Sequence, residues 1–168
     1  IIGVGNTAMD CCRSSLRMGA KTVKVMARKP RGFFKASEWE LEDAEAEQVE
    51  IIVNHAPKRF VIEQGRLTGM LFDKMEYELK DGRITAERVL GEELIPCDDV
   101  ILAIGQENAF PWIERDLGIA FDKWSVPTVE PKTFQSTHPK VFFGGDAAFG
   151  PKNIIWAVEH GHQAAISL

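Results

Sequence analysis

The stretch IIGVGNTAMDCCRSSLRMGAKTVKVMA, residues 1–27, decides the fold of this chain. It reads as the end of a strand, a glycine-rich turn, an amphipathic helix and a second strand over residues 22–27. The pattern Gly3-x-Gly5-x-x-Ala8 lies between the first strand and the helix, which is the context that a dinucleotide-binding fingerprint requires. This order of elements predicts the opening of a Rossmann-like unit, whereas a glycine turn selected only for packing is the alternative.

Each residue of the glycine turn has a separate expected role. Gly3 permits the tight turn, Gly5 lets the backbone approach a pyrophosphate, and Ala8 allows the helix to pack closely on the strand. The free N–H groups and the dipole of the helix N-terminus favour a phosphate. Asn6 or Thr7 is expected to cap this helix or to donate a hydrogen bond to a phosphate oxygen.

The residues after the second strand indicate which dinucleotide binds. Sites for NAD place an acidic residue about 20 residues beyond the glycines, where it accepts hydrogen bonds from the ribose hydroxyls. Here that region reads Arg28-Lys29 and contains no acid, and Arg31 and Lys35 follow. Cations suit a 2′-phosphate, so the sequence favours NADP(H) over NAD(H). A solvated basic loop that balances the following acidic helix is the alternative.

The remaining elements complete an α/β fold with an inserted meander. Ser37-x-x-Glu40 has the spacing of a capping box and opens an acidic helix to Gln48, which we expect to be a solvated face or a docking surface. A strand is expected over residues 50–54. Three extended segments separated by hairpin turns then predict an antiparallel meander; they cover residues 59–63, 66–79 and 84–95.

The rest of the chain returns to the parallel sheet and then becomes irregular. Residues 99–104 (DVILAI) form a nearly continuous apolar run, which predicts a strand buried on both faces. A short buried strand is expected over 141–143, followed by a Gly-Gly-Asp turn and a helix over 153–168. The tryptophans of this region, Trp112, Trp124 and Trp156, are expected in the core.

Composition and charge exclude several functions. The chain has 168 residues, with 20 Lys and Arg against 25 Asp and Glu, and this acidic balance disfavours nucleic acid as a partner. The apolar runs are shorter than the roughly 20 residues of a membrane span, so we expect a cytoplasmic protein without a membrane partner. Cys11, Cys12 and Cys97 form no CxxC pair and are expected to be buried, reduced thiols. No metal site is expected, since His160 and His162 face apart on a helix.

Four stretches together resemble one protein family: GVGNTAMD, ARKPRGF, DDVILAIGQ and FFGGDAAFGPKNIIWAVEHGHQAA. They are similar to the NADPH-dependent glutamate synthase small chain and its relatives in the pyridine nucleotide-disulfide oxidoreductase family, including the reductase half of dihydropyrimidine dehydrogenase. The resemblance implies a flavoprotein in which hydride passes from NADPH to FAD. It also implies that electrons leave through iron–sulfur clusters toward a redox partner subunit or a ferredoxin-like acceptor.

The resemblance also assigns binding residues and two domains. It implies that residues 1–122 form an NADP(H)-binding domain and that residues 123–168 are the C-terminal segment of an FAD-binding Rossmann-like domain. NADP(H) would contact Gly3, Gly5, Asn6, Thr7, Ala8, Arg28, Lys29 and Lys35, with the second dinucleotide-facing loop formed by Ala103, Ile104 and Gly105. The residues expected at FAD are Gly145, Asp146, Asn153 and Ile154; no catalytic residue is assigned.

The expected whole protein is longer than this chain. The strand before the glycine turn is mostly missing, as are the opening of the FAD domain and any cluster-binding part upstream, so we expect a fragment that is inactive by itself. An electron-transfer subunit for another enzyme and a noncatalytic dinucleotide-binding module are the alternatives. A flavin-free dehydrogenase would need an acid near the nicotinamide, and the only tyrosine, Tyr77, is expected in the meander, far from the turn.

Overall fold

The computed structural model describes all residues, 1–168, and divides them into two compact units. The first unit covers Ile1–Gly105 and the second covers Gln106–Leu168, and each is described by itself. The boundary between the compact units thus falls earlier in the chain than residue 122, where the sequence places the end of the NADP(H)-binding domain.

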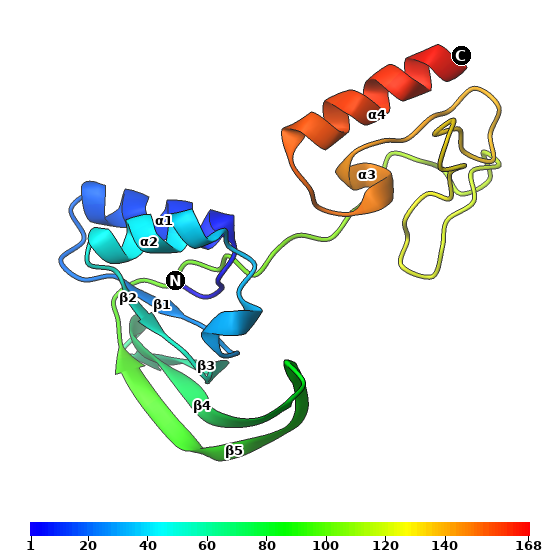
Figure 1. Cartoon of the computed structure of the whole chain (residues 1–168). Helices are drawn as coiled ribbons and strands as arrows, with labels where there is room; N and C mark the ends of the chain where they lie inside the picture. Colours follow the sequence, from blue (N-terminus) through cyan, green and yellow to red (C-terminus); the bar gives the residue numbers. More distant parts are fainter. The chain divides into compact units, whose positions relative to one another are not determined.

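A small parallel sheet is the centre of the first unit (Figure 1). Strand β1 (Lys24–Met26) pairs in parallel with β2 (Glu50–Ile52), with Val25 opposite Ile51. Ile2 forms parallel bridges to Met26 on one side and to Leu102 on the other. The residues around Ile2 therefore lie inside the parallel sheet, between β1 and the residues around Leu102, and the latter form one edge of the sheet. This is the βαβ order that the sequence predicts.

The edge segment departs from the expectation of a strand buried on both faces. Its backbone does join the sheet, because Ile2 N–H donates to Ile101 O at 2.8 Å and Ala103 N–H donates to Ile2 O at 2.8 Å. Three of its apolar side chains are exposed to solvent, however; Ile101 is 39%, Leu102 57% and Ile104 72% exposed. The prediction of full burial was wrong because a continuous apolar run does not reveal which strand lies at an edge.

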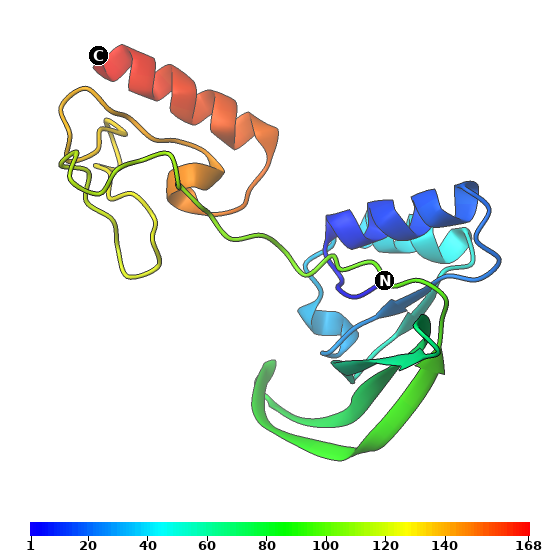
Figure 2. The ribbon, with the colours of Figure 1, turned by 180° about the vertical axis from the view of Figure 1, so that it is seen from behind.

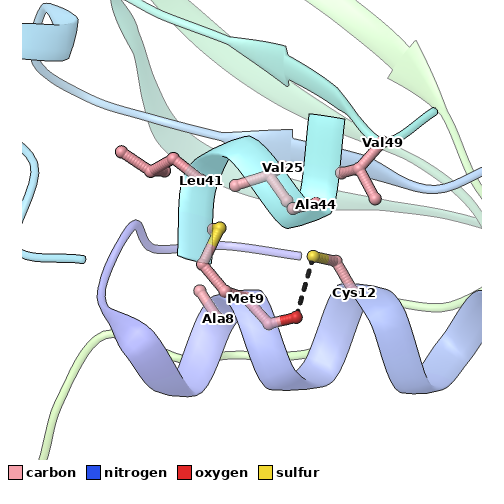
Figure 3. Close-up of a cluster of buried hydrophobic side chains, with 7 residues drawn as sticks. All are labelled: Ala8, Met9, Cys12, Val25, Leu41, Ala44 and Val49. Atoms are coloured by element: carbon pink, nitrogen blue, oxygen red, sulfur yellow. Dashed lines mark hydrogen bonds between the residues drawn. The ribbon is translucent and has the colours of Figure 1, made fainter. Parts of the chain in front are cut away.

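Two helices pack side by side on one face of the sheet (Figures 1 and 2). They are α1 (Asn6–Arg17) and α2 (Glu38–Ala46). Their apolar positions close over Val25 of β1, and Figure 3 shows the side chains that meet there. The buried members of this cluster are Ala8, Met9, Cys12, Val25, Leu41, Ala44 and Val49.

Charged residues join the outer parts of these helices. The Arg13 guanidinium of α1 lies 3.3 Å from Glu40, 3.1 Å from Asp43 and 2.8 Å from Glu47. The acidic side chains of α2 therefore face an arginine rather than solvent alone. Ser37 does stand at the N-cap of α2, but its side chain makes no cap hydrogen bond and its buried hydroxyl has no partner. The expected capping box does not form because Glu40 turns to Arg13 instead.

The Glu47 ion pairs predict a pH-dependent stability. Hydrogen bonds from Arg17 and Arg13 lower the pKa of Glu47, so the pairing stabilises the fold above the ordinary glutamate pKa. This contribution is lost as pH falls through the lowered pKa of the folded state. We expect Glu47→Gln to lower the thermal unfolding midpoint at neutral pH and to match the wild type in strong acid. A midpoint difference that is the same at both pH values would contradict this assignment.

The antiparallel meander covers the opposite face of the parallel sheet (Figure 1). Its strands are β3 (His55–Glu63), β4 (Arg66–Lys80) and β5 (Arg83–Pro96), in the order β3-β4-β5. Met70 and Phe72 of β4 pack against Ile2 and Met26 in a second buried cluster. Neighbouring residues of β1 thus face different layers, because Val25 contacts the helices and Met26 contacts the meander.

The second unit is mostly irregular and ends in two helices. These are α3 (Asp146–Phe149) and α4 (Ile154–Ser167). The expected strand over 141–143 is reduced to one antiparallel bridge between Gln135 and Phe142, although Phe143 is buried with Ile113 and Ile119. The expectation that the tryptophans are core residues was wrong, since all three are largely exposed in this unit; Trp112 is 73%, Trp124 74% and Trp156 46% exposed.

Candidate dinucleotide-binding site

Gly3 occupies a position that only glycine fits. Its backbone has φ +122°, and a Cβ atom added there would lie 2.2 Å from the carbonyl oxygen of Ala103. The Gly3 N–H donates to Met26 O at 3.2 Å, which fixes the turn to β1. The tight turn expected at Gly3 is therefore present, and it brings Ala103 of the second predicted loop directly against it.

Gly5 has the opposite surroundings. Its backbone is extended, with φ −99° and ψ 176°, and a Cβ atom added there would meet nothing within 4 Å. Gly5 is also the N-cap of α1, and the N–H groups of Asn6 and Thr7 have no acceptor in the chain, as is usual in a first helical turn. The space over Gly5 and these free donors together fit an anionic group such as a pyrophosphate.

Asn6 has a role that the sequence did not reveal. Its side chain does not cap α1; instead its Oδ1 accepts a hydrogen bond of 2.9 Å from the Ser37 N–H. The N–H groups of Lys35 and Ala36 donate to the Val4 carbonyl at 3.1 and 3.0 Å. The segment before α2 is therefore fastened to the glycine turn, and this places Lys35 beside it.

The cations after β1 fall into two groups. Arg31, in the short 3-10 helix η1 (Arg31–Phe33), is paired with α2, where its guanidinium lies 3.1 Å from Glu38 and also binds Glu45. These carboxylates raise the pKa of Arg31. Arg28, Lys29 and Lys35, by contrast, take part in no ion pair with the chain. Of the four cations considered from the sequence, these three remain available to an anion, and Arg31 does not.

Ala8 packs as the fingerprint requires, while the end of the edge segment stays open. Ala8 is fully buried in the helix cluster, which allows α1 to approach the sheet closely. After Ala103, Ile104 is exposed, and Gly105 has φ +105° with space around it. Of the three residues expected in the second dinucleotide-facing loop, the structure thus brings Ala103 to the glycine turn, whereas Ile104 and the space around Gly105 are open.

In the second unit, the two glycines before Asp146 pack on α4. A Cβ atom at Gly144 would lie 2.7 Å from the Cβ of His160, and one at Gly145 would lie 3.0 Å from the Cβ of Ala157. Gly145 has φ +57°, and its N–H donates to His160 Nδ1 at 2.9 Å. The sequence considered His160 only as a metal ligand, but its ring supports this turn.

The side chain of Asp146 lies in the open beside the start of α4. Its Oδ1 accepts the Lys152 N–H at 3.1 Å, while its other carboxylate oxygen has no partner. Asn153 caps α4, since its Oδ1 accepts the Trp156 N–H at 3.2 Å, and Ile154 is 82% exposed. Asn108, which the sequence missed, donates to the Asp146 carbonyl at 2.8 Å. These contacts keep Asp146 and the α4 N-terminus together.

The fold and the glycine turn are those of a Rossmann-like protein. The family model for pyridine nucleotide-disulphide oxidoreductases matches residues 1–161. The chain belongs to this family, as its resemblance to the glutamate synthase small chain implied.

Curated relatives and solved structures agree with that membership. The NADP(+)-dependent formate dehydrogenase subunit beta of Moorella thermoacetica is 37% identical over 173 residues, which cover 100% of this chain and 24% of that protein. The NADPH glutamate synthase small chain of Halomonas elongata is 34% identical over 171 residues, with 98% and 36% covered. This chain therefore spans only about a quarter to a third of these relatives. The crystal structure of T. acidophilum thioredoxin reductase has the same fold, with a TM-score of 0.77 at 22% identity, covering 99% of this chain and 50% of that one.

None of the helices has the length and apolar character needed to cross a membrane. The cysteines are free thiols; Cys12 is buried, as expected, but Cys11 and Cys97 are only partly buried. Burial raises the pKa of the Cys12 and Cys97 thiols, so both remain protonated at neutral pH.

Proposed function

We propose that this chain binds NADP(H) at the glycine turn and delivers hydride to FAD in the full-length protein, as an oxidoreductase of the glutamate synthase small-chain type. One observation carries the nucleotide part. The segment of residues 28–37, which we name the clamp loop, is hydrogen-bonded to the glycine turn through Val4 and Asn6. It thereby holds unpaired cations beside a helix N-terminus whose donors are free.

The charges of the clamp loop support NADP(H) in preference to NAD(H). A 2′-phosphate adds negative charge and acceptor oxygens, which the Arg28 guanidinium is suited to bind in a bidentate manner. Lys29 and Lys35 would add positive charge. The loop carries no carboxylate before Glu38, so it offers no acceptor for the 2′-hydroxyl of NAD.

The second unit supports a site for FAD. Asp146 has one carboxylate oxygen without a partner, which suits a hydroxyl donor. Asn153 and Ile154 begin α4, whose N-terminal dipole would favour negative charge on a reduced ring. Hydride transfer from nicotinamide to flavin is the chemistry that the two bound groups supply. The chain's own residues bind and orient them.

The iron–sulfur clusters implied by the resemblance have no fitting site within this chain. Cys11 and Cys12 are neighbours on α1, and the Cys12 thiol is directed to Met9 O at 3.1 Å. The chain contains no group of three or more side chains that could hold a metal ion. We propose that a redox partner subunit or a ferredoxin-like acceptor receives the electrons, because several relatives are named as subunits of larger enzymes.

The nucleotide preference is tested by calorimetric titration of the chain with NADP+ and with NAD+. We expect NADP+ to bind at least about ten-fold more tightly, which corresponds to roughly 1.4 kcal/mol. Arg28→Ala should bring the two affinities together, and raising the salt concentration should reduce the wild-type preference. Arg66→Ala removes an exposed arginine elsewhere in the first unit and is the matched control. Equal affinities for both nucleotides in the wild type would refute the assignment.

The flavin part needs the full-length protein. We expect NADPH to bleach its flavin absorbance under anaerobic conditions, and Asp146→Ala to lower the flavin content of the purified protein. Nucleotide binding without flavin and without reductase activity would instead support a noncatalytic dinucleotide-binding module.

A further inference from the structure

Tyr77 lies beside the clamp loop, although its place in the meander suggested a position far from the glycine turn. Its hydroxyl donates a hydrogen bond of 2.6 Å to the backbone carbonyl of Arg28. Tyr77 lies in the meander, as expected, and its contact with the residues after β1 arises because β4 continues past His55, the first residue of β3. Tyr77 is the single tyrosine of the chain.

The meander holds the chain at two successive carbonyl groups, that of the residue before the clamp loop and that of the first residue of the loop. Ala27 O accepts the N–H of His55, the first residue of β3, at 2.9 Å, and Arg28 O accepts the Tyr77 hydroxyl. The first bond is between backbone groups and continues the sheet. The second depends on one side chain, so it is the contact that a substitution can remove without disturbing the strands.

The other end of the clamp loop is held by the glycine turn, as described above. The loop is therefore anchored at both ends, by Tyr77 at Arg28 and by Val4 and Asn6 at Lys35–Ser37. Between these anchors the side chains of Arg28 and Lys29 have no ion pair. A charged fork that binds a phosphate in a bidentate manner needs a fixed backbone, because orientation as well as charge determines the strength of the contact.

The surroundings of the phenol keep it a hydrogen-bond donor. Burial raises the pKa of Tyr77, and the carboxylate of Glu87, its partner on β5, raises it further, while Arg28 opposes both. The hydroxyl is therefore protonated across the neutral range. Its hydrogen-bond partner in the chain is Arg28 O.

We propose that Tyr77 is a positioning residue for the 2′-phosphate clamp, through which the meander sets the preference for NADP(H) over NAD(H). This inference rests on the proposed function, because it assumes that Arg28 binds the 2′-phosphate. Tyr77 makes no hydrogen bond to the glycine turn and would act through the backbone of Arg28. Its loss therefore weakens the binding of the nucleotide that carries the phosphate and leaves the other unaffected.

The test is Tyr77→Phe, which keeps the ring and removes only the hydroxyl. We expect the affinity for NADP+ to fall about five-fold, in line with the loss of one hydrogen bond, and the affinity for NAD+ to stay unchanged. Thr85→Val is the matched control, because the Thr85 hydroxyl also donates to a backbone carbonyl of the same hairpin, that of Glu78, at 3.2 Å. If Tyr77 had only a structural role, Tyr77→Phe would lower the affinities for NADP+ and NAD+ equally, and this result would overturn the inference.

A second measurement does not depend on the variant being folded. Ring-fluorinated tyrosine incorporated into the wild-type chain gives a single fluorine resonance, because Tyr77 is the only tyrosine. NADP+ should shift this resonance and NAD+ should shift it much less; equal shifts would count against the inference. A wild type that does not prefer NADP+ overturns the proposed function together with the inference. A wild-type preference that survives in Tyr77→Phe overturns the inference alone.

Discussion

Gly3→Ala is expected to unfold the first unit. The new Cβ would lie 2.2 Å from the carbonyl oxygen and 2.8 Å from the carbonyl carbon of Ala103, and these backbone atoms are held in the sheet by the hydrogen bond from Ala103 N–H to Ile2 O. Relief of the clash would require the edge segment to leave the central strand. The φ of +122° adds strain for any residue with a side chain. We expect a loss of about 4 kcal/mol or more, a large part of the total stability of a small domain.

Chemical denaturation followed by circular dichroism measures this loss, and Gly19→Ala is its control. Gly19 also has a positive φ, +102°, but a Cβ atom there would meet nothing within 4 Å. Gly19→Ala therefore reports the conformational strain alone, about 1 kcal/mol. If the two variants are equally destabilised, the close approach of Ala103 to Gly3 is not present in solution.

Gly5→Val is expected to abolish nucleotide binding while leaving the fold intact. The backbone at Gly5 has φ −99°, which any residue adopts, and the direction of a side chain there is empty. The valine would fill the space that the proposed pyrophosphate requires against the helix N-terminus. We expect the affinities for NADP+ and NAD+ to fall together by about 100-fold or more, because both nucleotides share the pyrophosphate.

The control for this variant is Gly91→Val. Gly91 lies on β5, away from the glycine turn, and a Cβ atom there also meets nothing within 4 Å. Both variants should unfold at the wild-type denaturant concentration, and only Gly5→Val should lose binding in calorimetric titration. Retained binding in Gly5→Val would mean that the free space at the turn is not where the nucleotide lies.

The glycine turn and the layers around it could be predicted because their signals are local. Gly3, Gly5 and Ala8 each have a steric reason at a fixed spacing, and the expected strand, helix and second strand follow in order. The meander was predicted from turn residues for the same reason: Gln64-Gly65 and Asp81-Gly82 all have positive φ, as these hairpin turns require.

The hydrogen-bond partners of the site could not be predicted, because they lie far away in the sequence. The sequence predicts that Asn6 or Thr7 caps α1 or donates to a phosphate, and that Ser37 opens α2 in a capping box. In the structure the Asn6 side chain binds the Ser37 backbone instead, 31 residues away. Arg31 was grouped with the other cations, but the turn of η1 brings it to Glu38 and Glu45 of α2. Sequence spacing alone does not distinguish these partners from the local ones.

The second unit was predicted less well for a related reason. The ring of His160, which accepts the Gly145 N–H, packs against the rings of Phe134 and Phe149, with centroids 4.8 and 4.7 Å away. Phe134 belongs to an irregular segment, while Phe149 and His160 belong to two different helices, α3 and α4, so no single periodic pattern links them. A pair of glycines close in sequence to an apolar helix was the only signal for this packing, since a helix approaches a backbone most closely where side chains are absent.

The strands of the meander differ in length, and this allows its outer part to unfold separately from the rest of the first unit. The pairing of β3 with β4 begins at His55 opposite Lys74, and the Met75 N–H donates to Asn54 O, so residues 76–80 of β4 pair with β5 alone. A two-stranded ribbon is marginally stable by itself in water. The outer part of this hairpin is therefore a subglobal unit, able to fray while the parallel sheet and its helices remain folded. Fraying that reaches Tyr77 would break the bond from its hydroxyl to Arg28 O, and this end of the clamp loop would then be held only by the backbone bond from His55 N–H to Ala27 O.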